Sequence, residues 1–117
     1  MSQHLFNTIF RGDQVSILMG WDRPLQGYFM VVEKTQVDEF VYCNLDDARL
    51  DYCLGLPGSL QYFREKLREL GLCVPARMLR EIEDDARVNA GNRYVVYGMD
   101  GEIQVPAAAT SSSANTD

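Results

Sequence analysis

The sequence predicts an α+β fold in which two helices cover one face of a mainly antiparallel sheet, in the order β-β-β-β-α-α-β-β. The first part of the chain is rich in β-branched and aromatic residues broken by short polar stretches, which is typical of strands joined by hairpins. Two later segments place apolar residues at helical spacing, and a short strand-like stretch follows them. Because strand-rich and helix-rich blocks are segregated, α+β is favoured over alternating α/β.

Strands are expected throughout the first block. The runs rich in Val, Ile, Phe and Tyr cover residues 5–11, 14–21, 27–34 and 39–44. Gly12 and Asp13 mark a tight turn between the first two runs, and the motif TQVD joins the last two. Since these connections are short, an antiparallel meander is the natural arrangement.

The second of these strands predicts the environment of the single tryptophan. Apolar and polar residues alternate along it, with Leu18 as the exception, and Trp21 continues the apolar side. We therefore expect Trp21 in the core or at its edge. The following DRPLQG is typical of a hairpin turn, because Asp bonds its own backbone, Pro fixes φ and Gly tolerates positive φ. Asp22 and Arg23 are expected at the tip of that turn.

The segment 44–58 has no clean periodicity. A loop of this length is unusual in a compact domain, so the segment either hides a short element or is a functional loop. It carries three acidic residues: Asp46, Asp47 and Asp51.

Two amphipathic helices are expected next, in residues 59–70 and 75–91. Their apolar residues recur every three or four positions, as a helix with one buried side requires. The stripes are formed by Leu60, Phe63, Leu67 and Leu70 in the first helix and by Met78, Leu79, Ile82 and Ala86 in the second. Gly71 and Pro75 end one helix and begin the other, so the pair is expected to form a helical hairpin.

A final hairpin is expected from residues 93–98 and 102–105. Its YVVY run is strongly β-forming and uncharged, so it is expected either inside the sheet or at an edge that pairs with another chain. The remaining stretch, 106–117, is small and polar and is expected to be a disordered tail. The sequence thus predicts a single α+β domain over residues 1–105.

Composition narrows the classes of function. The net charge of −6 argues against a direct nucleic-acid-binding surface and against attraction to an anionic membrane. Cys43, Cys53 and Cys73 show neither a disulfide framework nor zinc-ligand spacing. No secretory signal or membrane-length apolar run is apparent, so we expect a soluble, cytoplasmic protein.

Familiar catalytic patterns are missing from the sequence. It contains no GxGxxG, Walker or HExxH motif, and any nucleophile–histidine pair would depend on the single His4. The acidic residues of the second helix (Glu81, Glu83, Asp84 and Asp85) are expected on its solvated side. We therefore predict no catalytic residue, no metal site and no cofactor. The candidates for binding are Trp21, Asp22, Arg23, Asp46, Asp47, Asp51 and Arg93.

The pattern MGWDRPLQGYFMVVE, followed by LPGSLQYF, ELGLCVPARML and NAGNRYV, resembles a group of small uncharacterised bacterial proteins, some of them encoded on plasmids or similar mobile elements. The resemblance covers most of residues 15–97. It implies no activity and no site residue, but it favours a regulatory or interaction role over central metabolism.

The leading hypothesis is a non-enzymatic protein-interaction or regulatory module whose partner is another protein, with a homodimer through a sheet edge as a further possibility. The alternative is a small ligand-binding domain or enzyme with its site near segment 44–58, where Trp21, Asp22 and Arg23 would meet Arg93. A third hypothesis is an acidic protein that occupies the nucleic-acid site of a partner, whose binding would weaken with added salt.

Overall fold

The computed structural model describes residues 1–104, so the expected tail at 106–117 lies outside the described residues. The strands are β1 (Ser2–Phe10), β2 (Asp13–Asp22), β3 (Gly27–Lys34), β4 (Phe40–Cys43), β5 (Arg93–Tyr97) and β6 (Ile103–Gln104). The helices are α1 (Gln61–Leu70) and α2 (Ala76–Arg87), preceded by the short 3₁₀ helices η1 (Asn44–Asp46) and η2 (Ala48–Cys53).

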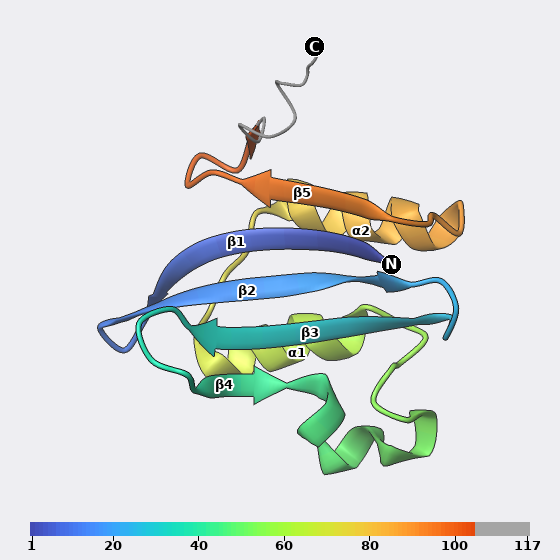
Figure 1. Ribbon diagram of the computed structural model, residues 1–117, viewed down its shortest axis with the longest axis horizontal. Coiled ribbons are helices and arrows are strands. Elements are labelled where there is room, and N and C mark those ends of the chain that lie inside the picture. The colour runs from blue at the N-terminus through green and yellow to red at the C-terminus, as the bar shows by residue number, and fades with distance from the viewer. Residues whose placement is uncertain (105–117) are drawn as a thin grey trace.

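The strands form one sheet in the order β4-β3-β2-β1-β5-β6. Neighbouring strands run antiparallel except β1 and β5, which are parallel. The α+β class and the mostly antiparallel sheet are therefore confirmed, but the sheet is mixed. The first four strands form the expected meander, whereas the chain passes behind the sheet through both helices before β5 returns beside β1 (Figure 1).

The expected helical hairpin is confirmed only in part. Both helices lie behind the same face of the sheet (Figure 1). However, α2 packs against β1 and β2, whereas Phe63 of α1 meets the Tyr42 ring of β4 edge to face, with ring centroids 6.4 Å apart. An ion pair of 3.0 Å between Arg64 and Glu83 links the two helices. Each helix therefore covers its own part of the sheet.

The core lies between the helices and the strands, as the alternation along β2 predicts. Val15, Ile17 and Met19 are fully buried, and Trp21 is only 7% exposed. The Trp21 ring meets the Tyr28 ring edge to face at 5.1 Å, and its indole N–H donates a hydrogen bond of 3.1 Å to Asn89 Oδ1. Aromatic pairs favour this edge-to-face arrangement. The indole therefore lies in the seam between sheet and helices.

The outer edge of β3 is covered by two different elements. β4 is short and pairs only with the second half of β3. In the first half, the Met30 N–H donates to Asn44 Oδ1 and the Tyr28 N–H donates to the Pro57 carbonyl oxygen, at 3.4 and 2.9 Å. Segment 44–58 thus satisfies backbone groups that would otherwise form an open sheet edge. Among the described residues, no helix is long and apolar enough to cross a membrane.

Candidate functional site

Segment 44–58 hides two short elements, η1 and η2, and folds back on itself. Its anchor is Leu50, whose side chain is fully buried. The Gly55 N–H donates to the Leu50 carbonyl oxygen at 2.8 Å, and Asn44 Nδ2 donates to the Gly55 carbonyl oxygen at 2.8 Å. These bonds tie Asn44 and Leu50 to Gly55 and so hold the backbone between residues 44 and 55 in place.

Asp47 ties the segment to the rest of the fold. Its Oδ2 accepts hydrogen bonds of 2.7 Å from the hydroxyls of both Tyr42 and Tyr62, and its Oδ1 accepts the Arg49 N–H at 3.1 Å. Burial opposes ionisation of this carboxyl, but the two tyrosine hydrogen bonds and the Arg49 N–H hold the pKa of Asp47 below its usual value. Burial, with the carboxylate second, raises the pKa of both tyrosines. Asp47 is therefore committed to fixing β4, η2 and α1.

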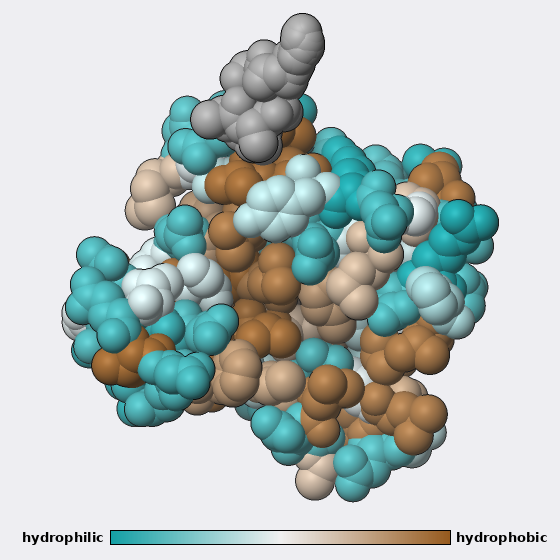
Figure 2. All heavy atoms as spheres, in the orientation of Figure 1, coloured by the Kyte–Doolittle hydropathy of each residue, from teal (hydrophilic) through white to brown (hydrophobic). Residues whose placement is uncertain are grey.

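The same segment exposes three large side chains, which we call the loop patch: Leu45, Tyr52 and Leu54. Their exposed fractions are 69%, 82% and 79%. Hydrophobic side chains gather at the surface over this segment in Figure 2. The carboxylates of Asp46 and Asp51 are exposed beside them, and neither forms an ion pair with another described residue. Of the predicted acidic residues, these two remain free to meet a partner, and Asp47 does not.

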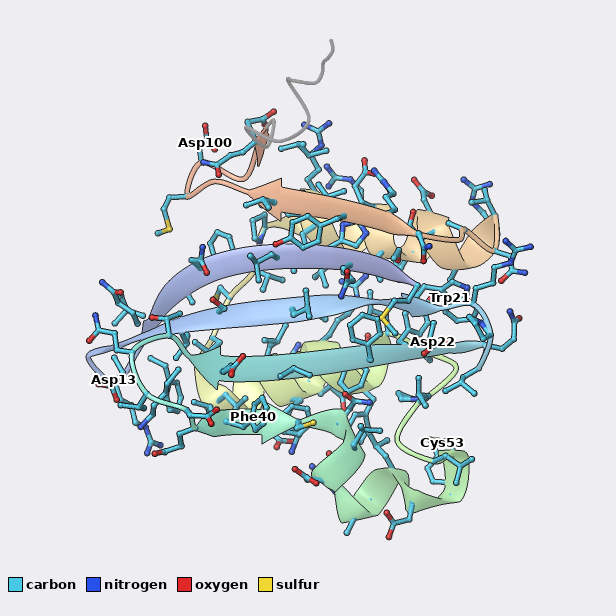
Figure 3. All side chains as sticks on the ribbon, in the orientation of Figure 1. Asp13, Trp21, Asp22, Phe40, Cys53 and Asp100 are labelled. Atoms are coloured by element: carbon cyan, nitrogen blue, oxygen red, sulfur yellow. The ribbon has the colours of Figure 1, made fainter. Side chains whose placement is uncertain are left out.

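Trp21 and Asp22 end β2, so Asp22 lies at the base of the hairpin turn and not at its tip, whereas Arg23 lies in the turn. Asp22 is buried, and its Oδ1 accepts the Leu25 N–H at 3.1 Å, as expected for a turn-forming aspartate. Gln26 Nε2 donates to Asn89 Oδ1 at 2.8 Å, so the turn is joined to the end of α2 by the same oxygen that accepts from the indole. Figure 3 shows Trp21 and Asp22 at the end of β2, with Cys53 on the separate segment 44–58.

Arg93 belongs to a buried network that the sequence did not predict. Its Nη1 donates to Asp85 Oδ1 at 2.7 Å and its Nη2 donates to Glu81 Oε1 at 2.6 Å. Asp85 Oδ2 lies 2.6 Å from His4 Nε2, and the Tyr97 hydroxyl lies 2.8 Å from His4 Nδ1. The expectation that Asp85 lies on the solvated side of its helix is wrong, because its side chain follows Met78 and Ile82 on the buried side of α2.

The protonation of this network follows from its burial. His4 is fully buried and Asp85 is 3% exposed. Burial lowers the pKa of His4, outweighing the hydrogen bond to Asp85, which would raise it. The carboxyl of Asp85 is also buried, yet hydrogen bonds from His4, Arg93 and Ser2 hold its pKa below the usual value. Only Arg93 and Glu81 reach the surface, and the groups between them and Tyr97 are buried, so the network is placed to stabilise the fold.

The alternation of residues at the N-terminus could have placed His4 in the core, but the first strand was predicted too short to include His4. The expected strand began at residue 5, whereas β1 begins at Ser2. In the longer strand, His4 shares the parity of Ser2 and Phe6, and all three side chains are buried against the helices. A strand extended to the N-terminal residues would have placed His4 on the core side.

The predicted binding residues do not converge on one site. Trp21 and Arg93 are connected through Ser2, whose hydroxyl accepts the Trp21 N–H and which pairs with Arg93 between β1 and β5, but Ser2 is fully buried. The acidic residues of segment 44–58 lie next to β3, near the edge of the sheet that is opposite to the edge formed by β5 and β6.

Surface hollows do not single out these residues either. Among the main open depressions of residues 1–104, the largest, about 530 Å³, is lined by the β3–β4 turn together with Ser16, Glu33 and Lys34, and none of them includes Trp21, Asp22, Arg23 or segment 44–58. Arg93 lines a shallow one of about 310 Å³. Drug-sized ligands need concave, mostly enclosed sites. Within residues 1–104, no three His, Cys, Asp or Glu side chains are grouped to hold a metal ion.

The site that remains is the loop patch, which is exposed, rigid and flanked by free carboxylates. Comparison of the chain with protein-family models, with curated proteins and with solved structures gives no match in any of the three.

Proposed function

We propose that the protein is a non-enzymatic interaction module that binds a partner protein through the loop patch. The observation that carries this proposal is the exposure of Leu45, Tyr52 and Leu54, at 69–82%, on a backbone anchored by the buried Leu50 and by internal hydrogen bonds. Large side chains of this kind are the usual anchors of protein interfaces, where a few buried aromatic or aliphatic groups contribute most of the binding free energy.

The rigidity of segment 44–58 supports this role. Leu50 fills the core beneath it, Asp47 joins it to two tyrosines, and Asn44 bridges its two ends. Leu54 is held in the left-handed region, at φ 57°, a conformation that non-glycine residues adopt only when their surroundings impose it. A partner therefore meets side chains already in place, which reduces the entropy lost on binding.

The charges beside the patch indicate the chemistry of the partner. Asp46 and Asp51 flank the apolar side chains, and the whole chain carries −6. The matching surface is an apolar pocket rimmed by Lys or Arg, because opposite charges around an apolar centre favour encounter and fix orientation. A small-molecule site is less well supported, since the depressions on the protein surface are shallow and lie away from the loop patch.

The first test compares retention of a partner from native-host extract by the wild type, Leu45→Glu and a matched control, Leu25→Glu. Leu25 is 62% exposed and lies in the β2–β3 turn, so both variants add one charge to an exposed leucine. We expect one specific protein to bind the wild type and the control with equal affinity, and Leu45→Glu to weaken binding at least about 30-fold, the loss typical of a hot spot.

Two results would overturn the proposal: no protein retained by the wild type, or equal retention by Leu45→Glu. Thermal unfolding of each variant separates a lost contact from a lost fold. Because Leu45 is largely exposed, its replacement is expected to leave the unfolding midpoint unchanged within about 2 °C.

A further inference from the structure

The face of the sheet opposite the helices carries an unbroken apolar row. The strand registers place Val96 beside Leu5, Leu5 beside Leu18, Leu18 beside Val31 and Val31 beside Cys43. All five residues are half-buried. They form one line across five strands, and Figure 2, which looks onto this face, shows a hydrophobic band crossing the strands. We call this line the central row and the surface around it the open face.

The open face has almost no charge. Its outward positions along the six strands include no Lys or Arg, and its only acids are Glu33 and the buried turn residue Asp22, both at strand ends. Further apolar side chains flank the row, namely Ile9, Phe40 and Tyr94, which are 56%, 53% and 52% exposed. Most of the other outward positions are polar but uncharged, namely Gln3, Asn7, Gln14, Ser16 and Gln104. A sheet face in contact with water normally alternates to polar residues, so it is the unbroken apolar row across the centre that favours cover by another surface.

We propose that two copies of this chain associate through their open faces, with the two central rows packed against each other. Five strands spaced by about 4.8 Å, with about seven residues of roughly 3.3 Å each, present a face of roughly 24 by 23 Å. That is about 550 Å² on each copy and about 1,100 Å² in total, just above the roughly 1,000 Å² needed for a specific interface.

The composition of the face favours a second copy over an unrelated protein. A two-fold axis places the same patch on both sides, so an uncharged apolar row is complementary to itself without any pairing of charges. Sheets pack face to face at about 10 Å with their strands at about 30° to each other, an arrangement in which the side chains of the two central rows can interdigitate. The modest area gives a concentration-dependent dimer rather than a permanent one.

Sedimentation equilibrium from about 1 µM to about 1 mM protein tests the proposal, with Leu45→Glu as the matched control for Leu18→Glu. Leu18 is half-buried on the open face and Leu45 is on segment 44–58, so each variant replaces one leucine by the same charge. We expect a reversible monomer–dimer equilibrium for the wild type, a dissociation constant raised at least tenfold by Leu18→Glu, and one changed less than twofold by Leu45→Glu.

The native cysteines provide a second readout that needs no substitution. Cys43 ends the central row, and Cys73 is an exposed residue between the two helices. With rising protein concentration, the rate of labelling of Cys43 by a maleimide is expected to fall in parallel with dimer formation. The rate for Cys73 stays constant.

Three outcomes overturn the proposal. A wild type that stays monomeric throughout the concentration range is one. A dimer that Leu18→Glu does not weaken is another, because it uses a different surface. The third is a chain that is always monomeric and whose binding to a partner protein is abolished by Leu18→Glu, because the open face then binds that partner and not a second copy. The proposed function is tested separately, by whether Leu45→Glu weakens the binding of the partner protein.

Discussion

The side chain of His4 is enclosed where β1, β5 and α2 meet, with a carboxylate at one ring nitrogen and a phenol at the other. A neutral imidazole with its proton on Nε2 satisfies every group: Nε2–H donates to Asp85 and Nδ1 accepts from the Tyr97 hydroxyl. Arg93 already supplies the positive charge that Asp85 needs. The arrangement therefore keeps His4 neutral, in agreement with the lowering of its pKa by burial.

His4 makes stability dependent on pH in a window where no carboxyl titrates normally. The unfolded chain binds the imidazole proton near pH 6.5, whereas the folded chain binds it only at lower pH. The unfolded state therefore gains protons first, and the free energy of unfolding falls as the pH decreases from about 7.5 to about 5, at up to about 1.4 kcal/mol per pH unit. Urea unfolding at each pH measures this slope.

Because His4 is the only histidine in the chain, His4→Gln provides a direct control. The variant is expected to be less stable but to lose the slope between pH 7.5 and 5.5. The NMR shift of the single imidazole gives its pKa in the folded state. A pKa above 6.5 would mean that the ion pair with Asp85 dominates over burial and that this account of the network is wrong.

At the scale of elements, one glycine fixes how closely β1 approaches β2. A Cβ at Gly20 would collide with the carbonyl oxygen of Ser2 and lie 2.9 Å from the Phe29 ring, which covers this position on the open face. Backbone cannot yield as a flexible side chain can. The glycine is therefore required by the contact between strands and not by a turn.

We predict that Gly20→Ala lowers the free energy of unfolding by at least about 2 kcal/mol, the range for overpacking against rigid atoms. Gly58→Ala is the matched control, since a Cβ there meets nothing within 4 Å. That substitution is expected to be neutral or to stabilise by up to about 1 kcal/mol through the unfolded state. The midpoints of urea unfolding of the two variants measure this difference in stability, and equal midpoints would contradict the prediction.

The same scale shows what local sequence patterns can and cannot predict. Alternation along β2 and the three-to-four spacing in α1 and α2 are local, and they predicted those elements and the burial of Trp21 correctly. The 3₁₀ helices have no apolar stripe, and the parallel pairing of Ser2 with Arg93 joins residues distant in the sequence. Asp85 is buried because its partners come from β1 and β5, which no pattern within its own helix reveals.

Over the whole molecule, the two proposed surfaces differ in charge. The loop patch lies on the segment that borders β3, with Asp46 and Asp51 beside it, whereas the open face is the broad side of the sheet and its central row is uncharged.

This difference in charge predicts opposite responses to salt. Two chains of −6 repel each other, so raising the ionic strength from about 0.05 M to about 0.5 M screens the repulsion and strengthens self-association. The partner, recognised through opposite charge, dissociates more readily over the same range. Sedimentation and titration calorimetry in one series of buffers measure both. Responses of the same sign would show that one of the two proposed interfaces has the wrong chemistry.

The parallel pairing of β1 with β5 also affects how the chain is made. The β-meander is complete once Cys43 has emerged from the ribosome, but the strand that covers the other edge of β1 ends at Tyr97. At about 5–20 residues per second, roughly 50 further residues take about 3–10 s to synthesise. For that interval β1 is paired with β2 on one side only, and its other edge is open to chaperones or to a second nascent copy.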